Sequence, residues 1–172
     1  MPSRYNVGDA DSLRHRTEPG NMSIIIRQAT PADAPVIVTF NCLMARETEG
    51  KDLDRALIEP GVRAVLADLH KGRYLVAERD GEIVGQIGIT FEWSDWRNGW
   101  FWWIQSVYVA ATARRQGVFR ALYRYVEEAA RADPAVIGIR LYVERENGPA
   151  HSTYHNLGMR LTSYQILEKY PL

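Results

Sequence analysis

The feature that most constrains this chain is an apolar segment that runs through a short basic turn into an amphipathic helix. Residues 106–110 are typical of a strand, Arg114 to Gly117 form the turn, and the hydrophobic period becomes helical after it. The start of a helix has about four backbone N–H groups without partners and about half a positive charge, so it attracts phosphate oxygens. The sequence therefore predicts an anion-binding site at this junction.

The residues of the turn suit a phosphate ligand. Gly117 allows the main chain to approach such a ligand closely, and Arg114, Arg115 and Arg120 supply charged donors around it. A solvated basic loop is the alternative interpretation of this stretch alone. The turn lacks the G-x-x-x-x-G-K-[ST] pattern of nucleotide hydrolases and the three glycines of a dinucleotide-binding fingerprint, so both of those classes are excluded.

Two motifs in the chain resemble those of one enzyme family. The pattern Arg114-x-x-Gly117-x-Phe119 after an apolar strand resembles the R/Q-x-x-G-x-G/A signature of the GNAT superfamily of N-acetyltransferases. A second stretch, further along the chain, is similar to the family motif N-x-x-A-x-x-x-Y-x-x-x-G-F. The residues in register there are Asn147, Ala150, Tyr154 and Gly158, with Met159 in place of the phenylalanine, and the whole resemblance covers residues 24–170.

The resemblance implies a layered α/β fold, with a mixed, mostly antiparallel sheet whose central strands splay apart and helices on its faces. It implies an N-acetyltransferase that moves an acetyl group from acetyl-coenzyme A to a primary amine of a small molecule, by direct transfer in a ternary complex. Main-chain N–H groups of the turn would hold the pyrophosphate, and the strand before it would align the pantetheine. The residues so implied in cofactor binding are Val107, Val109, Arg114, Arg115, Gln116, Gly117, Val118, Phe119, Arg120 and Asn147.

The second motif assigns Tyr154 as the general acid. Tyr154 follows Asn147 by seven residues, about two helical turns, so both side chains lie on one face of a helix. A phenol held there protonates the departing thiolate of coenzyme A. The acceptor amine must lose a proton before it attacks, and Glu92 is the first candidate for the base, with a water relay as the alternative. Main-chain N–H groups near Tyr108 or Val109 would hold the oxyanion.

All five tryptophans lie within residues 92–103, around a turn at Asn98 and Gly99. This turn is too aromatic for an ordinary hairpin tip and predicts contact with the substrate or a partner, with packing over the end of the sheet as the alternative. Trp102 and Trp103 point to opposite faces of their strand, so one of them belongs to the core. The side chains predicted to contact the acceptor are Glu49, Trp93, Asp95 and Trp96, with Glu47 beside Glu49 at the end of one helix.

The chain departs from the family pattern at two positions. Phe119 stands where the family usually has Gly or Ala, and Ala111 stands where it often has Pro. A side chain at a helix start can point outward while its N–H faces a phosphate, so Phe119 is compatible with the cradle. A non-catalytic module that binds or senses acyl-coenzyme A through the tryptophan-rich hairpin is the alternative function.

Composition excludes several other classes. The 21 basic and 21 acidic side chains give no net charge, so no global field attracts nucleic acid or anionic lipid. The single cysteine, Cys42, excludes a disulfide framework and a thiolate metal cluster. His151 and His155 lack a third ligand, so we expect no metal. No apolar run has the length of a membrane span, which predicts a cytoplasmic protein, and exposed strand edges are compatible with a homodimer.

The chain is expected to contain one domain over residues 22–172. Residues 1–21 show no period and are expected to be a disordered extension, unless translation begins at Met22. Thr30 is the expected cap of the first helix, and Pro60 is expected to begin a helix of its own. The expected strands are 23–29, 73–79, 82–92, 101–110, a central strand at 136–143 and a last strand at 161–170; the expected helices are 31–47, 53–58, 60–69, 116–131 and 147–157.

Overall fold

The computed structural model describes residues 23–171, which form two compact units. The first unit ends at Leu141 and the second begins at Tyr142, and each is described by itself. The prediction for residues 1–21 lies outside the described residues, and a single domain over 22–172 stays a prediction.

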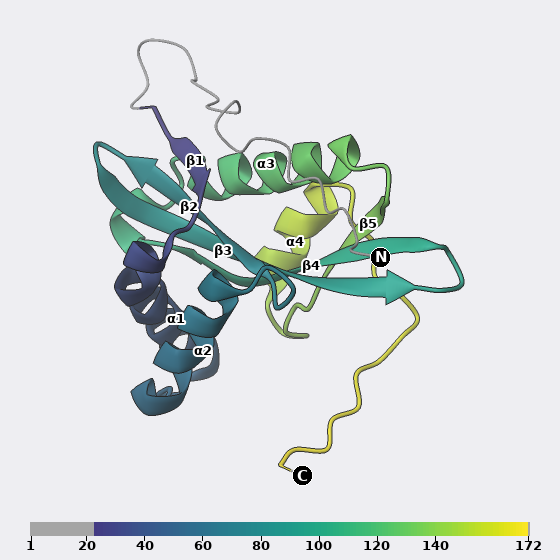
Figure 1. The fold of residues 1–172 in the computed structure, drawn as a ribbon, viewed down its shortest axis with the longest axis horizontal. Coiled ribbons are helices and arrows are strands. Elements are labelled where there is room, and N and C mark those ends of the chain that lie inside the picture. Colours follow the sequence, from purple (N-terminus) through teal and green to yellow (C-terminus); the bar gives the residue numbers. More distant parts are fainter. Residues whose placement is uncertain (1–22, 172) are drawn as a thin grey trace. The chain divides into compact units, whose positions relative to one another are not determined.

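The first unit is built on a five-stranded sheet with the order β1-β2-β3-β4-β5 (Figure 1). The pairs β1–β2, β2–β3 and β3–β4 are antiparallel, and the pair β4–β5 is parallel. This mixed, mostly antiparallel sheet confirms the predicted fold class. The strands are β1 (Ile25–Gln28), β2 (Arg73–Arg79), β3 (Glu82–Ser94), β4 (Gly99–Val109) and β5 (Val136–Leu141).

Helices cover both faces of this sheet. Helices α1 (Ala34–Glu49) and α2 (Arg55–Ala67) lie on one face and α3 (Val118–Ala132) lies on the other (Figure 1). Neighbouring residues of β3 face opposite sides of the sheet. Gln86 bonds to Asn41 of α1, whereas Gly85 lies against Val118 of α3. In α3 the residues 118, 122, 126 and 130 are all buried, the four-residue spacing of a helix that packs one stripe on a sheet.

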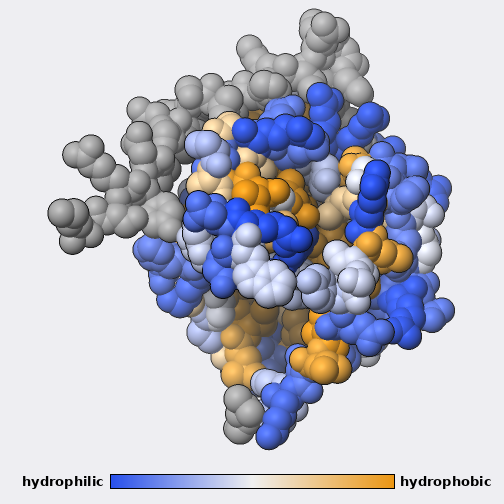
Figure 2. Space-filling model, turned by 90° about the vertical axis from the view of Figure 1, so that its right-hand side faces the viewer, coloured by the Kyte–Doolittle hydropathy of each residue, from blue (hydrophilic) through white to orange (hydrophobic). Residues whose placement is uncertain are grey.

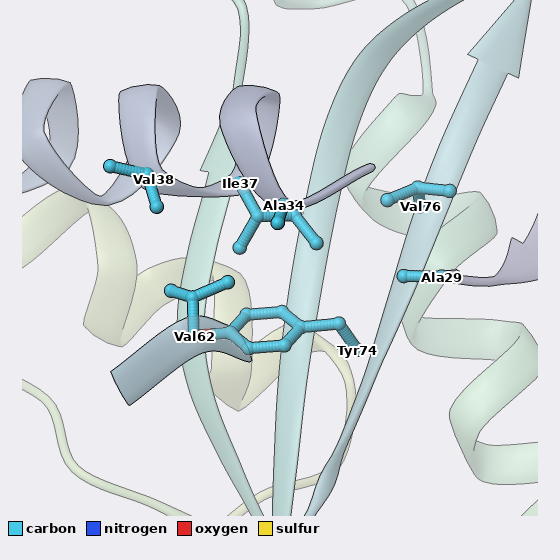
Figure 3. Close-up of a cluster of buried hydrophobic side chains, with 7 residues drawn as sticks. All are labelled: Ala29, Ala34, Ile37, Val38, Val62, Tyr74 and Val76. Carbon is cyan, nitrogen blue, oxygen red and sulfur yellow. The ribbon is translucent and has the colours of Figure 1, made fainter. Parts of the chain in front are cut away.

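A cluster of buried apolar side chains joins β2 to α1 and α2 (Figure 3). Figure 3 shows Val62 of α2 and the ring of Tyr74 of β2 lying beside Ile37 of α1. Ile37 and Val76 are completely buried, so these contacts supply the hydrophobic free energy that fixes the two helices on the sheet. The members of the cluster are Ala29, Ala34, Ile37, Val38, Val62, Tyr74 and Val76.

Two expectations for this unit differ from the structure. One helix, α2, replaces the two that were expected, and Pro60 lies inside it. It stays continuous because Asp54 caps its start and Ile58, Val62 and Leu66 pack on the core from both sides of the proline. The strand expected to be central, β5, pairs with β4 alone among residues 23–171 and forms an edge of the described sheet.

The second unit contains one helix, α4 (Gly148–Asn156). The Asn147 side chain caps it, since Asn147 Oδ1 accepts a hydrogen bond of 3.1 Å from the Ala150 N–H. The strand expected over residues 161–170 is wrong, because the structure has no strand there. A strand needs a neighbour for its hydrogen bonds, and Leu161, Leu167 and Tyr170 are more than 80% exposed.

An ion pair fixes the start of the first helical segment. Asp33 accepts two hydrogen bonds from the Arg27 guanidinium, of 2.8 and 3.0 Å, and one of 2.7 Å from the Thr30 N–H. The hydrogen bonds from Arg27 lower the pKa of Asp33 to about 2, although burial of the carboxylate opposes the shift. The predicted cap at Thr30 is therefore joined to β1 through a charged pair.

We expect Asp33→Asn to lower the free energy of unfolding at pH 7 by about 1–3 kcal/mol, because charge-assisted hydrogen bonds are lost. The Asp33 pKa is lowered in the folded protein, so its contribution is present above the ordinary value of 3.8 and is lost as the pH falls toward about 2. Denaturant unfolding of both proteins between pH 7 and pH 2 measures the difference, which should shrink across that range. Asp80→Asn, in an exposed turn, is the control, and a difference that does not change with pH would contradict the prediction.

Candidate functional site

Strand β4 pairs with β5 over only part of its length. Their pairing runs from Trp100 and Val136 to Ile104 and Leu141, whereas β4 continues to Val109. Beyond Ile104, β4 is paired with β3 on one side and, within residues 23–141, with no strand on the other. The splayed strands implied by the resemblance stay a prediction, because β5 ends at Leu141, where its pairing with β4 ends. This open edge leaves main-chain N–H and C=O groups of β4 available to an extended ligand.

A β-bulge lies at the point where the two strands separate. Gln86 pairs with Tyr108 and Gly88 pairs with Gln105, so two residues of β4, Ser106 and Val107, stand opposite one residue of β3. Ser106 has a φ of 51°, a left-handed conformation that non-glycine residues seldom adopt. Sequence analysis missed this bulge, because no local pattern at residue 106 distinguishes it from a regular strand.

The turn after β4 has the backbone that an anion site requires. A short helical turn (Ala111–Ala113) follows β4, and Arg115 and Gly117 then take positive φ values of 61° and 82°. Gly117 is the N-cap of α3, so the N–H groups of Gly117, Val118 and Arg120 have no carbonyl within the helix to bond to. The helix begins two residues later than expected, which places Gln116 in the turn.

Arg114 is tied to the opposite side of the sheet. Its Nε donates to the Val109 carbonyl at 3.0 Å, and its guanidinium forms an ion pair with Glu47, near the end of α1. Glu47 also accepts a hydrogen bond of 2.9 Å from the Tyr108 hydroxyl. Burial raises the pKa of Glu47, but the hydrogen bonds from Arg114 and Tyr108 outweigh it and hold the pKa below its usual value. Glu47, considered for the acceptor, is thus paired with the turn.

The other polar residues of the turn have different surroundings. Gln116 accepts a hydrogen bond from Arg79 and donates one of 2.9 Å to the Thr112 carbonyl, which braces the turn from within. Arg115 and Arg120 are exposed, and neither forms an ion pair with the residues that the structure describes. These two guanidinium groups are available to a ligand of opposite charge.

Phe119 lies on the surface of α3 beside the turn. Its ring packs on that of Tyr123, with the ring centroids 6.1 Å apart, so the phenyl group is accounted for by an aromatic contact along the helix. The bulky Phe119 side chain therefore lies along α3, on Tyr123.

Glu92, the predicted base, lies in a cluster of charged and aromatic side chains. It accepts hydrogen bonds of 3.0 and 3.1 Å from Arg140 of β5 and a further one from the indole of Trp103. Arg140 also stacks on Phe101, 3.6 Å from the ring centroid. Glu92 pairs with Phe101, four residues along β3 from Gly88 at the bulge, which corresponds to about 13 Å.

The tryptophan-rich hairpin between β3 and β4 has an aromatic pair at its base. Trp93 and Trp100 meet edge to face with centroids 5.1 Å apart, whereas Trp96 at the tip is 87% exposed and Asp95 accepts a hydrogen bond from its N–H. Trp102 is 5% exposed, which confirms that one of the two adjacent tryptophans belongs to the core. Figure 2 views the molecule from the side on which this hairpin ends and shows hydrophobic groups gathered between hydrophilic ones.

Other predicted residues are placed as follows. Glu49, at the end of α1, forms an ion pair of 2.8 Å with Lys51, and both side chains are exposed. Asn147 and Tyr154 belong to the second unit, on the cap and on the body of α4, so their place beside the turn stays a prediction. Among residues 23–171, no cluster of histidine, cysteine and acidic side chains could hold a metal ion, and no helix is long and apolar enough to cross a membrane.

Comparisons with known proteins agree with this geometry. Residues 42–159 match the model of the acetyltransferase (GNAT) family. The chain belongs to the GNAT acetyltransferase family. A possible acetyltransferase from Clostridium difficile 630 is 45% identical, with a TM-score of 0.82, and the match covers 87% of this chain and 98% of that one. The family and this relative identify the chain as an acyltransferase.

More distant structures share the GNAT fold. An aminoglycoside acetyltransferase from an uncultured soil metagenomic sample has a TM-score of 0.67 at 20% identity, covering 87% of this chain and all of that one. The ribosomal-protein-alanine N-acetyltransferase of Brucella melitensis biovar Abortus 2308 has a TM-score of 0.70 at 15% identity, covering 86% and 99%. No curated protein matches the sequence.

We expect Gly117→Ala to destabilise this GNAT acetyltransferase by about 1–2 kcal/mol, because an L-residue is strained at a φ of 82°. The new methyl group itself would meet nothing within 4 Å, so the effect isolates the backbone. Gly61→Ala is the matched control, since Gly61 lies inside α2, also in open space, and its replacement should stabilise by about 0.5–1 kcal/mol. Denaturant unfolding measures both, and a neutral Gly117→Ala would contradict the interpretation.

Proposed function

We propose that this protein is an N-acetyltransferase that moves an acetyl group from acetyl-coenzyme A to a primary amine of a small molecule, by direct transfer in a ternary complex. The observation that carries the proposal is the open edge of β4, which leads directly into the turn at Gly117. An extended chain can hydrogen-bond along that edge while its diphosphate reaches the N–H groups at the start of α3.

The residues proposed to hold the cofactor act in three ways. The main chain of Val107 and Val109 aligns the pantetheine, and the N–H groups of the turn bind the pyrophosphate. Arg115 and Arg120, which have no acidic partner among the described residues, supply charge at the phosphates. Arg114 shapes the turn through Glu47 and Val109. The remaining proposed contacts come from Gln116, Gly117, Val118, Phe119 and the side chain of Asn147.

The proposed reaction needs an acid and a base. The amine loses a proton and attacks the thioester carbonyl, a C–N bond forms, and the C–S bond breaks as Tyr154 protonates the leaving sulfur. Main-chain N–H groups near Tyr108 or Val109 stabilise the oxyanion. Glu92 takes the proton of the amine, and its distance along β3 from the bulge means that water molecules carry the proton to it.

The proposed acceptor is a small molecule with a primary amine. Two structural relatives are named for different acceptors, an aminoglycoside and the alanine of a ribosomal protein, so this part of the proposal rests on the chain's own residues. The exposed tryptophans and neighbouring carboxylates offer apolar contact and negative charge, which suits an organic cation. The residues proposed to contact it lie toward two ends of β4, so one small acceptor meets one group or the other. They are Trp93, Asp95 and Trp96 of the hairpin, and Glu49, two residues beyond Glu47, which bonds to Tyr108.

Replacement of the acid should separate catalysis from cofactor binding. We expect Tyr154→Phe to lower kcat by about a hundredfold or more, because the thiolate then leaves without a proton, while the Kd of acetyl-coenzyme A is unchanged. Thiol release across a panel of amines measures the rate, and calorimetry measures binding. Tyr164→Phe is the matched control, since Tyr164 is 72% exposed in the same unit. An unchanged rate for every acceptor would exclude Tyr154 as the acid, and release that no amine accelerates would favour the non-catalytic module.

Replacement of the proposed base should lower the rate without weakening cofactor binding. We expect Glu92→Gln to lower kcat by about tenfold to a hundredfold, because the amide cannot accept the proton of the amine, while the Kd of acetyl-coenzyme A is unchanged. The exposed Glu82, on the same strand, supplies the control variant Glu82→Gln. A kcat of Glu92→Gln equal to that of Glu82→Gln would mean that solvent or another carboxylate accepts the proton.

A further inference from the structure

A buried polar network lies directly behind the bulge in β4. Gln86 is completely buried, and its Nε2 donates to the Ser106 carbonyl at 3.1 Å and to Asn41 Oδ1 at 2.7 Å. Asn41, which is 2% exposed, donates from Nδ2 to the Tyr74 hydroxyl at 3.2 Å, and that hydroxyl lies 3.5 Å from Ser106 Oγ. Three elements, α1, β2 and β3, thus converge on one residue of β4.

This network contains two features that proteins usually avoid. Gln86 Oε1 is buried without a hydrogen-bond partner among the described residues, and Ser106 holds a left-handed backbone conformation. Unsatisfied polar atoms and strained backbone persist where the surrounding structure fixes them, and they concentrate at functional sites. The strained residue, Ser106, lies two residues beyond the last pair of β4 with β5, and Gln86 of β3 bonds to its carbonyl.

The orientation of the Gln86 amide follows from its donors. Nε2 carries two hydrogens, and both have acceptors, one on the bulge and one on α1. Holding these two bonds leaves Oε1 without a partner. The side chain is therefore arranged to hold the Ser106 carbonyl, and an apolar residue of the same size would fill the space but remove the donor to that carbonyl and to Asn41 Oδ1.

We propose that Gln86, supported by Asn41 and Tyr74, is a positioning residue that fixes the Ser106 bulge and so directs the main chain of Val107 toward the thioester. The inference rests on the proposed function. The bulge rotates the peptide groups of residues 106 and 107 relative to a regular strand. The hydrogen bond from Gln86 Nε2 to the Ser106 carbonyl holds them in that orientation. Gln86 acts through the backbone, at a distance from the reacting atoms.

Two variants of the network test this role. Gln86→Met keeps the approximate size and removes both donors, and we expect kcat to fall by about tenfold to a hundredfold because the thioester is misplaced. The Kd of acetyl-coenzyme A should stay within about twofold, because the diphosphate contacts lie elsewhere. Tyr74→Phe keeps the buried ring and removes the hydroxyl, so it should fold and show a smaller fall in kcat in the same direction. If Gln86→Met does not fold, the kcat of Tyr74→Phe tests the positioning role in its place.

The control and a second readout separate positioning from general stability. Val126→Ala makes a cavity under α3, on the face of the sheet opposite the network, so it should lower the Tm and leave kcat unchanged below the transition. Amide hydrogen exchange of the free protein should be faster at residues 106–108 in Gln86→Met and unchanged in Val126→Ala. Unchanged exchange at these residues in Gln86→Met, or a kcat no lower than that of Val126→Ala, overturns the proposal. The exchange measurement needs no substrate, so it tests the proposal even if no amine is acetylated.

Discussion

The structure of this site depends on one constraint: β4 cannot pair with a strand on both edges and also present main chain to a ligand. The pairing with β5 stops at Ile104, and the bulge at Ser106 follows immediately. Once β5 has ended, the backbone groups of β4 need other partners, and a bound chain can supply them. The buried network around Gln86 makes this arrangement rigid, because it holds the bulge from the side away from solvent.

Charge at the turn is divided between structure and binding. The chain has no net charge, so any attraction for a diphosphate must come from local groups. Arg114 is paired with Glu47 across the sheet, and this pair joins the turn to the end of α1. Arg115 and Arg120 are exposed, lie beside the start of α3 and form no ion pair among residues 23–171, and we propose that they bind the diphosphate. An anion held there would lie on a turn that is already braced by α1, which lowers the entropic cost of binding.

The opposite end of the sheet has a different chemistry. The ion pair of Glu92 with Arg140, and the stacking of Arg140 on Phe101, link β3, β4 and β5 over the part where all three strands are paired. The hairpin beyond this pair carries its tryptophans in two environments, since Trp93 and Trp100 pack on each other whereas Trp96 is exposed. The turn at Gly117 and the aromatic hairpin thus follow and precede β4, at its two ends.

The sequence by itself determined the element types along most of the first unit, because the hydrophobic period, the Thr30 cap and the glycine at 117 act locally. It also predicted the basic turn from Arg114 to Gly117 and its place between a strand and a helix. Only the tertiary structure decided where β5 leaves β4, that Pro60 is accommodated inside a helix, and that residues 161–170 form no strand. Only the tertiary structure also decided the partners of Gln86 and Arg114, which are Asn41 and Glu47. These lie 45 and 67 residues away in the sequence, and no local pattern indicates a contact over that separation.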